Sequence, residues 1–183
     1  MIICYNKNME KNEFLEIIKT RRSVRSFIDK QVSNEDLKMI LEAGEFAPSG
    51  MGKQSPYFVV IQDKKEREEV MKLNASFMGI DKDPYYNAPT IILVLGDSNV
   101  HTYVEDCSCA IENMLLMAHA LNIDSIWIHR EKEMFDSVKG KELLAKWGLS
   151  NSLAGVGAIA LGYRSENFNP VVKPRKEDYF KII

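Results

Sequence analysis

The chain has 183 residues, of which 45% are hydrophobic and 27% are charged, so it is long enough for one domain with a sizeable core and is unlike a disordered protein in composition. Its 24 Lys and Arg residues are balanced by 26 Asp and Glu residues, and this net charge of −2 excludes the broad positive field that binds nucleic acid. No stretch approaches the roughly 18 consecutive apolar residues that span a bilayer, so we expect a soluble protein without a membrane partner.

The N-terminal segment and the cysteines indicate where the protein works. Residues 1–12 form an expected leader that lacks the basic start and long apolar region of a secretory signal, which predicts a cytoplasmic protein with a single domain over residues 13–183. Cys4, Cys107 and Cys109 have no framework spacing, so we expect reduced thiols. Cys107 and Cys109 lie two apart in an expected helix and point to different faces, so no metal site is predicted.

The first part of the chain predicts two helices. Apolar residues at helical spacing in NEFLEIIKT predict a helix over residues 12–20, with Asn12 as its N-cap. A second helix is expected to begin at Ser33, because Ser33 and Asp36 match a capping box, and to stop by Pro48. The basic stretch RRSVRSF therefore follows directly after the first helix.

The rest of the chain alternates between strands and helices. Apolar segments predict strands over residues 57–63, 88–97, 124–129 and 155–163. Helical patterns are expected over residues 64–78, 103–122 and 132–148. Because the strands are apolar on both faces and separated by helices, we expect an α/β fold in which helices cover both faces of a sheet. The order begins with two helices, so it is not a plain nucleotide-binding βαβ array.

Three apparent motifs favour structural explanations. GVGAIA, residues 155–160, fits G-x-G-x-x-A, but its glycines lie within the last expected strand and no helix follows, which favours close packing. GMGKQS has Gln54 where a phosphate loop carries Ser or Thr, so we exclude that loop. His119 lies among apolar residues in LLMAHAL and is expected to be a satisfied helix histidine rather than a base.

RRSVRSF, residues 21–27, has two interpretations. Arg21 and Arg22 can complement the negative end of the preceding helix and stay solvated. Alternatively, three guanidiniums with Ser23 between them supply the forked donors that suit a phosphate. Arg25 lies beyond the helix end and favours the phosphate site.

Two further segments suggest the rest of a ligand site. In APSGMGKQSPY, the glycines allow close approach of the backbone to a flat ligand, and Ser49 and Gln54 can contact its polar edge. The tail KPRKEDY adds Lys173, Arg175 and Lys176. Together with RRSVRSF, these segments suggest a ligand that has both a phosphate and a planar polar ring.

At this point the chain resembles a known family. RRSVRSF, APSGMGKQSPYFVV, AIENMLLMAHALNIDSIWI and GVGAIALGY occur in the order typical of the FMN-dependent nitroreductase family, and the resemblance covers Glu13 to about Asp178. It implies an α/β fold, classed as α+β in some schemes, with three layers around a mixed sheet. It also implies an obligate homodimer with one FMN in each of two interface clefts, and a C-terminal tail that packs on the partner subunit.

The resemblance implies phosphate ligands near both ends of the chain: Arg21, Ser23, Lys173 and Arg175. Arg22 and Arg25 are expected near the phosphate or the pyrimidine edge of the flavin, where a guanidinium would stabilise the reduced ring.

Ring contacts are implied by two turns. Pro48, Ser49 and Gly50 match the turn that the second subunit lays against the ring, and Ile128, His129 and Arg130 match the turn whose backbone reaches the flavin N5 region. Gly52 departs from the pattern, because many members have Asn there; we expect Gln54 or a backbone group to replace that amide. Further ring contacts are expected around residues 81–87.

The resemblance also implies the chemistry. NADH or NADPH would pass a hydride to bound FMN, and a nitroaromatic, a quinone or a similar acceptor would then take the electrons in a ping-pong cycle. No catalytic side chain is expected, because the flavin carries the chemistry. Two alternatives stay open: the same fold used for dehalogenation, flavin degradation or enal reduction, and a flavin-binding protein without turnover.

Overall fold

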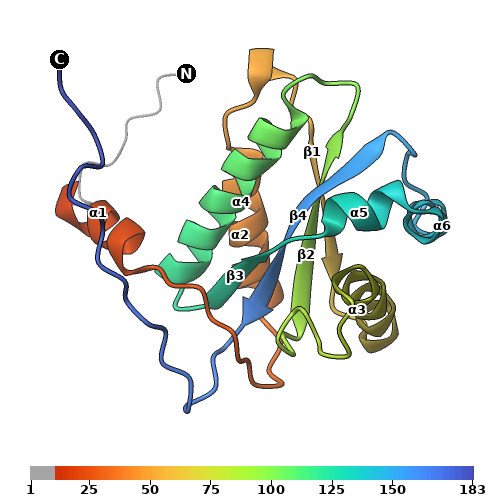
Figure 1. Cartoon of the computed structure of the whole chain (residues 1–183), viewed down its shortest axis with the longest axis horizontal. Coiled ribbons are helices and arrows are strands. Elements are labelled where there is room, and N and C mark those ends of the chain that lie inside the picture. Colours follow the sequence, from red (N-terminus) through yellow and green to blue (C-terminus); the bar gives the residue numbers. More distant parts are fainter. Residues whose placement is uncertain (1–10) are drawn as a thin grey trace.

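The computed structural model describes residues 11–183 (Figure 1). Cys4 and residues 1–10 of the expected leader lie outside the described residues. The helices are α1 (Lys11–Thr20), α2 (Asn34–Glu45), α3 (Lys64–Met78), α4 (Tyr103–Ala120), α5 (Glu131–Asp136) and α6 (Val138–Lys146), with one 3-10 helix, η1 (Gly50–Gly52). The strands are β1 (Pro56–Ile61), β2 (Thr90–Asp97), β3 (Asp124–Ile128) and β4 (Leu153–Gly162).

The four strands form one sheet in the order β1-β2-β4-β3, and each pair is antiparallel. The expected mixed sheet therefore has little parallel pairing within one chain: among residues 11–183, the parallel contact is an isolated bridge between Ser23 and Ser125. This bridge attaches the segment after α1 to β3, so the backbone of the arginine-rich stretch is held against the sheet.

Helices cover both faces of the sheet, as the apolar strands predict (Figure 1). On one face, α2 and α4 pack on Ile92 and Val94. On the other face, α3, α5 and α6 pack on Ile91, Leu93 and Leu95. Side chains of β2 alternate between the two clusters because successive residues of a strand point to opposite faces. All five of these side chains are 0% exposed.

Two local details differ from the sequence expectations. α1 already includes Lys11, so Asn12 lies inside the helix and is not its N-cap. The helix expected over residues 132–148 is divided at Ser137, whose side chain accepts from the Gly140 N–H and begins α6. Gly140 allows this bend because a Cβ there would lie 2.0 Å from the Met134 carbonyl oxygen. The Ser33 cap of α2 is confirmed.

The glycines of GVGAIA serve close packing, as expected. They lie inside β4, and a Cβ at Gly157 would lie 2.4 Å from Nε1 of Trp127. A Cβ at Gly155 would lie 2.0 Å from the carbonyl oxygen of Glu131. Within residues 11–183, no helix is both long and apolar enough to cross a membrane.

Candidate functional site

The segment after α1 is fixed against β3. The Val24 N–H donates to the Ser125 carbonyl oxygen at 3.1 Å, and Val24 and Phe27 are buried. Between and beside these two anchors, Ser23 is half-buried and Arg25 is exposed. The backbone therefore presents Arg25 to solvent from a fixed position.

The three guanidiniums have different surroundings. Nη1 of Arg22 donates to the carbonyl oxygens of Lys19 and Arg21, so Arg22 caps the C-terminal end of α1. Nε of Arg21 lies 4.0 Å from the Glu112 carboxylate. Arg25 makes no hydrogen bond or ion pair with another residue in the range 11–183. Arg22 therefore completes a helix end, as the first interpretation of RRSVRSF expects, while the phosphate interpretation, which depends on Arg25, stays a prediction.

The arginine segment lies at the C-terminal end of α4. Oγ1 of Thr20 and Nε2 of His119 form a hydrogen bond of 2.8 Å that joins the end of α1 to α4. Burial, and then the charge of Arg21, lower the pKa of His119 below its usual value. His119 is therefore a paired helix histidine, as expected from its apolar flanks.

The turn that follows α2 is held by a buried carboxylate. The Gly50 N–H donates to Oδ1 of Asp106 at 2.9 Å, and Oγ of Ser55 donates to Oδ2 at 2.7 Å. Asp106 is only 4% exposed. Burial acts to raise its pKa, but the hydrogen bonds from Ser55, Gly50 and Thr102 outweigh it and hold the pKa below the ordinary value. Asp106 is therefore a charged anchor in the first turn of α4.

Backbone strain is concentrated in the same turn. Met51, Gly52 and Gln54 have φ of 53°, 65° and 49°, a left-handed conformation that is rare for residues other than glycine, asparagine and aspartate. The Gln54 N–H donates to Oγ of Ser49, which closes the turn. A groove of about 660 Å³ lies beside it, lined by Leu41, Gly44, Glu45, Phe46, Ala47, Ser49, Gln54, Pro56, Tyr57 and Phe58.

The arginine segment and this turn lie at opposite ends of α4 (Figure 1). Asp106 and His119 are 13 positions apart, and a helix rises about 1.5 Å per residue, so the two anchors are separated by about 20 Å along the helix. One chain therefore does not bring the predicted phosphate ligands and the Pro48–Gly50 turn around a common point.

The third predicted element is the turn after β3. Arg130 has φ of 95°, a strained value for a side chain of this size, and it directly precedes α5. The His129 ring is exposed and stacks on Trp127 with centroids 5.6 Å apart. Nδ2 of Asn74, from α3, donates to the His129 carbonyl oxygen at 3.1 Å. Strain of this kind is typical of functional sites, where surrounding contacts hold it in place.

A buried polar network that was not predicted from the sequence supports that turn. Oε1 of Glu131 accepts from the Tyr85 hydroxyl at 3.1 Å and from Nδ2 of Asn74 at 3.2 Å. All three side chains are 0% exposed. Burial raises the pKa of Glu131 to about 8 and that of Tyr85 well above its usual value. Glu131 belongs to the charged run HREKE, so nothing in the sequence distinguishes it from its exposed neighbours.

The predicted tail ligands make no hydrogen bond with the arginine segment among the described residues. Lys173 and Arg175 are exposed and lie after β4 in a segment without helix or strand. Neither makes an ion pair with another described residue. Figure 1 shows this tail leaving the sheet on the side where α1 lies.

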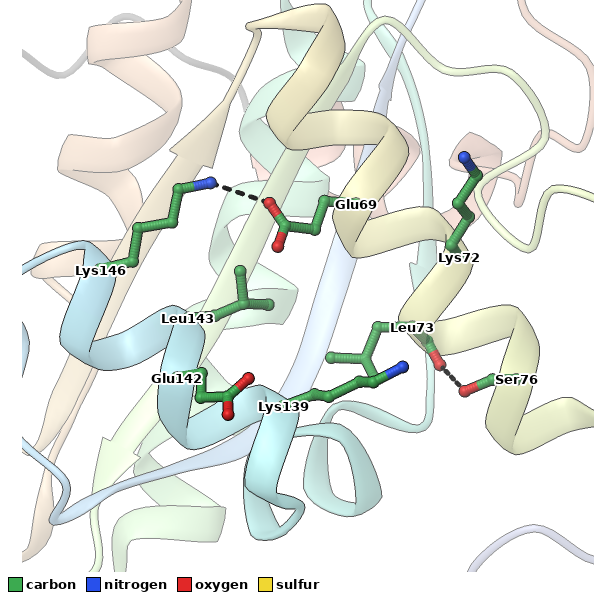
Figure 2. A pocket seen from close by; sticks show the side chains of 8 residues that line it. All are labelled: Glu69, Lys72, Leu73, Ser76, Lys139, Glu142, Leu143 and Lys146. Atoms are coloured by element: carbon green, nitrogen blue, oxygen red, sulfur yellow. Dashed lines mark hydrogen bonds and ion pairs between the residues drawn. The ribbon is translucent and has the colours of Figure 1, made fainter.

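A second hollow, of about 390 Å³, lies between α3 and α6 (Figure 2). Some of its lysine and glutamate side chains form ion pairs with one another, as in the 2.8 Å contact of Lys146 Nζ with Glu69 Oε2. It contains none of the residues predicted for the ligand site, so the three segments described above remain the candidate site.

Comparisons with known proteins cover nearly the whole described chain. Residues 18–80 and 71–163 match the model of the nitroreductase family. A protein of Archaeoglobus fulgidus with the provisional name NADH dehydrogenase/NAD(P)H nitroreductase is 36% identical over 159 residues, which are 82% of this chain and 85% of that protein.

Two solved structures contain the cofactor that the sequence predicts. A nitroreductase with bound FMN from Bacteroides fragilis is 34% identical and has a TM-score of 0.87, covering 94% of this chain and 99% of that chain. A nitroreductase with bound FMN from Desulfitobacterium hafniense is 25% identical and has a TM-score of 0.83, covering 95% of this chain and 100% of that chain.

Proposed function

This chain belongs to the nitroreductase family, and on this basis we propose that it is an FMN-dependent oxidoreductase that uses NADH or NADPH to reduce nitroaromatics, quinones or related acceptors. The observation that carries the proposal is its likeness, over almost its full length, to a nitroreductase that binds FMN. A cytoplasmic location stays a prediction.

The residues present fit a flavin phosphate. Arg25 is exposed and has no partner among residues 11–183, and it is held beside Ser23 and Arg21 on a fixed backbone. Guanidinium and hydroxyl donors are the groups that bind phosphate through charge-assisted hydrogen bonds. We assign the phosphate to Arg21, Ser23 and Arg25, with Lys173 and Arg175 added from the tail.

The two strained turns fit the ring. FMN, when bound, supplies the acceptor and donor of electrons, and the chain has to orient the ring and contact its polar edges. The turn at Ile128, His129 and Arg130 offers backbone groups whose direction is set by the left-handed conformation of Arg130. The turn at Pro48–Gly50 leads into the left-handed residues Met51, Gly52 and Gln54, and the space beside Gly52 is open to a ligand. These contacts orient the ring; no side chain is required as a nucleophile.

A homodimer explains why the two sets of ligands lie apart in one chain. The arginine segment and the Pro48–Gly50 turn are about 20 Å apart along α4, and on this ground we infer that a second copy supplies one of them to each flavin. The tail supports this arrangement, because Val171 and Phe180 are 80% and 83% exposed. Val172, Tyr179, Ile182 and Ile183 of the same tail are exposed as well, and a group of exposed apolar side chains, unlike a single one, is typical of a surface that another molecule covers.

The visible spectrum of the purified protein tests the proposal. The protein should be yellow or should become yellow with added FMN. Anaerobic NADPH or NADH should bleach it, and a nitrofuran or menadione should restore the colour. A protein that cannot be reconstituted with FMN would overturn the proposal, while colour without bleaching would identify a flavin-binding protein without turnover.

A further inference from the structure

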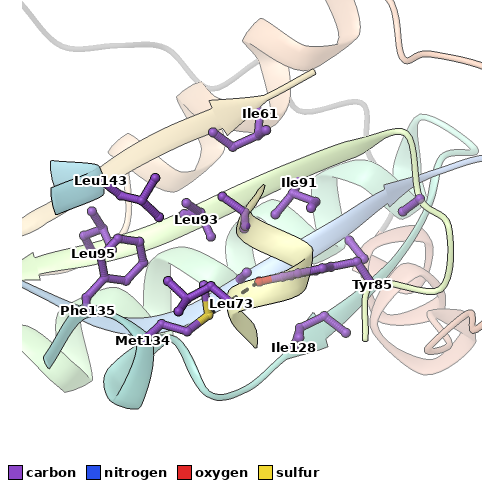
Figure 3. Close-up of a cluster of buried hydrophobic side chains, with 14 of the residues drawn as sticks. Ile61, Leu73, Tyr85, Ile91, Leu93, Leu95, Ile128, Met134, Phe135 and Leu143 are labelled. Carbon is purple, nitrogen blue, oxygen red and sulfur yellow. Dashed lines mark hydrogen bonds between the residues drawn. The ribbon is translucent and has the colours of Figure 1, made fainter. Parts of the chain in front are cut away.

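Glu131 is an acidic side chain in the apolar core, next to the turn assigned to the flavin ring. Its side chain is 0% exposed and lies among residues of the cluster that includes Met134 and Phe135. Figure 3 shows Tyr85 extending through this cluster, with its hydroxyl directed toward the Met134 region. A carboxylate is costly in such surroundings unless a cation pairs with it.

No cation faces Glu131 within residues 11–183. Two titratable groups act on it: the hydrogen bond from Tyr85, in the segment before β2, lowers the pKa of Glu131, while the negative charge of Glu133 on its own helix raises it. From α3 the polar contact is Asn74, which is uncharged. From β4 the contact is Gly155, whose missing side chain makes room for the Glu131 carbonyl group. Burial is accordingly the main cause of the raised pKa of Glu131, about 8.

Asn74 connects the carboxyl group to the turn. Its Nδ2 donates both to Oε1 of Glu131 and to the carbonyl oxygen of His129, so the amide is placed between the two. Arg130, with φ of 95°, lies between those residues in the chain. A strained residue persists only where its surroundings determine its conformation. The bonds through Asn74 supply such a constraint on the side of the turn that faces the core.

Ionisation would disturb this arrangement. Oε2 of Glu131 has no hydrogen-bond partner within the described chain, so a second charged oxygen would lie unpaired in the core. A carboxylate in that position lowers its free energy by moving toward water. Because Glu131 directly follows Arg130, that movement would displace the turn.

We propose that Glu131, in its neutral form, is a positioning residue that holds the His129–Arg130 turn in shape for FMN, and that loss of its proton loosens the turn and weakens FMN binding in alkaline solution. This inference rests on the proposed function, because it assigns the turn to the flavin.

FMN titrations of the wild-type chain, Glu131→Gln and Glu142→Gln test the proposal. Gln keeps the acceptor oxygen but cannot ionise, and Glu142 is an exposed glutamate of α6 that serves as the matched control. Dissociation constants are measured by flavin fluorescence from about pH 7 to about pH 9, above the second phosphate pKa of about 6. We expect the wild type and the control to lose affinity up to about tenfold per pH unit above the Glu131 pKa, while Glu131→Gln stays nearly flat.

A second measurement examines the turn without cofactor. Amide hydrogen exchange of peptides covering residues 128–132 is followed in the apoprotein, with intrinsic rates corrected for pH. Exchange should accelerate above about pH 8 in the wild type and not in Glu131→Gln. If the chain binds FMN but Glu131→Gln retains the wild-type pH dependence in both measurements, the inference is overturned and the proposed function stands. If no FMN binds at any pH, the proposed function and the cofactor role of the turn both fail.

Discussion

The backbone N–H of Gly50 donates to the Asp106 carboxylate at 2.9 Å, joining the strained turn after α2 to the first turn of α4. Oγ of Ser55 donates to the second oxygen of the same carboxylate. This one buried charge therefore holds both ends of the segment from Gly50 to Ser55, which directly follows the turn that we assign to the flavin ring, although Asp106 is not itself assigned to the ligand.

Replacing Asp106 should destabilise the protein. Asp106→Ala leaves the Gly50 N–H and the Ser55 hydroxyl without their acceptor, which costs about 2–4 kcal/mol of unfolding free energy because hydrogen bonds to charged groups contribute about 1.5–3 kcal/mol each and are not additive. Urea unfolding measures the loss. The matched control is Asp136→Ala, whose partner Lys132 is exposed, and it should change the stability by under about 1 kcal/mol. Equal losses in the two variants would contradict the anchor role of Asp106.

The arginines should differ in their effect on FMN binding. Arg25→Ala should raise the dissociation constant for FMN about 10- to 100-fold, since it removes charge-assisted hydrogen bonds to the phosphate. Arg22→Ala should affect binding less and lower the stability of α1, because its guanidinium is bonded to helix carbonyl groups. Fluorescence titration and circular dichroism separate the two effects. An unchanged affinity in Arg25→Ala would remove Arg25 from the site.

The absence of the Asn side-chain amide at Gly52 can be tested directly by substitution. The φ of Gly52 is 65° and no atom lies within 4 Å of a Cβ built there, so Gly52→Asn has room and needs only a left-handed backbone, which Asn tolerates. We expect the variant to fold with a loss of about 1 kcal/mol or less and to bind FMN more tightly. Gly52→Val is the control, since a β-branched residue is strained at this φ. Weaker FMN binding by the Asn variant would show that the turn already has its full set of ring contacts.

The stability of the apoprotein should depend on Glu131 and pH. Its pKa is raised from 4.5 in the unfolded chain to about 8 in the folded chain, so the folded chain holds the proton more tightly. The stability that the Glu131 proton contributes is fully present below about pH 4.5. It is lost as the pH rises toward 8, by up to about 1.4 kcal/mol per pH unit. Urea unfolding between about pH 5 and pH 8 measures this loss. The free energy of unfolding of Glu131→Gln should increase relative to that of the wild type with each step to higher pH. Parallel curves for the two proteins would mean that Glu131 ionises without cost.

Mixing two variants that each bind FMN weakly tests the shared site. Arg25→Ala damages the proposed phosphate ligands, and Gly50→Val damages the proposed ring turn, because a Cβ there would lie 2.2 Å from Oγ1 of Thr102. After reversible dissociation and random pairing, half of the dimers contain both variants and each such dimer has one intact site, so about one quarter of the FMN sites should return. Each variant treated alone is the control. No recovery in the mixture would mean that both elements serve the same flavin from one chain.

The sequence could predict the helices and strands because their signals are local. The Ser33 cap, the apolar strands and the long apolar helix all appear within short windows, and the structure has each of them. The division at Ser137 was missed because the charged pattern continues across it, although serine followed by a helical pattern is itself a cap signal. Asp106 could also have been found: it lies four positions before buried Ala110, on the same helix face.

The network at Glu131 could not be predicted in the same way. Its partners Asn74 and Tyr85 are 57 and 46 positions away in the chain, and only the packing of α3 and the segment before β2 against α5 makes Glu131 a buried residue. A charged run is normally a solvated helix face, and Glu133, two residues on, is half exposed. Long-range packing, which has no local signature, decides between those two outcomes.

The length of α4 has a consequence for how relatives of this protein can differ. One end of this helix carries the anchor of the ring turn and the other carries the anchor of the arginine segment. An insertion or deletion between Asp106 and His119 would shift and rotate one anchor against the other, and the twofold symmetry of the proposed homodimer would repeat the error in its second cofactor site. Differences in chain length among relatives should therefore fall in exposed connections, such as residues 79–83 and 148–152, and spare the interval between those two residues.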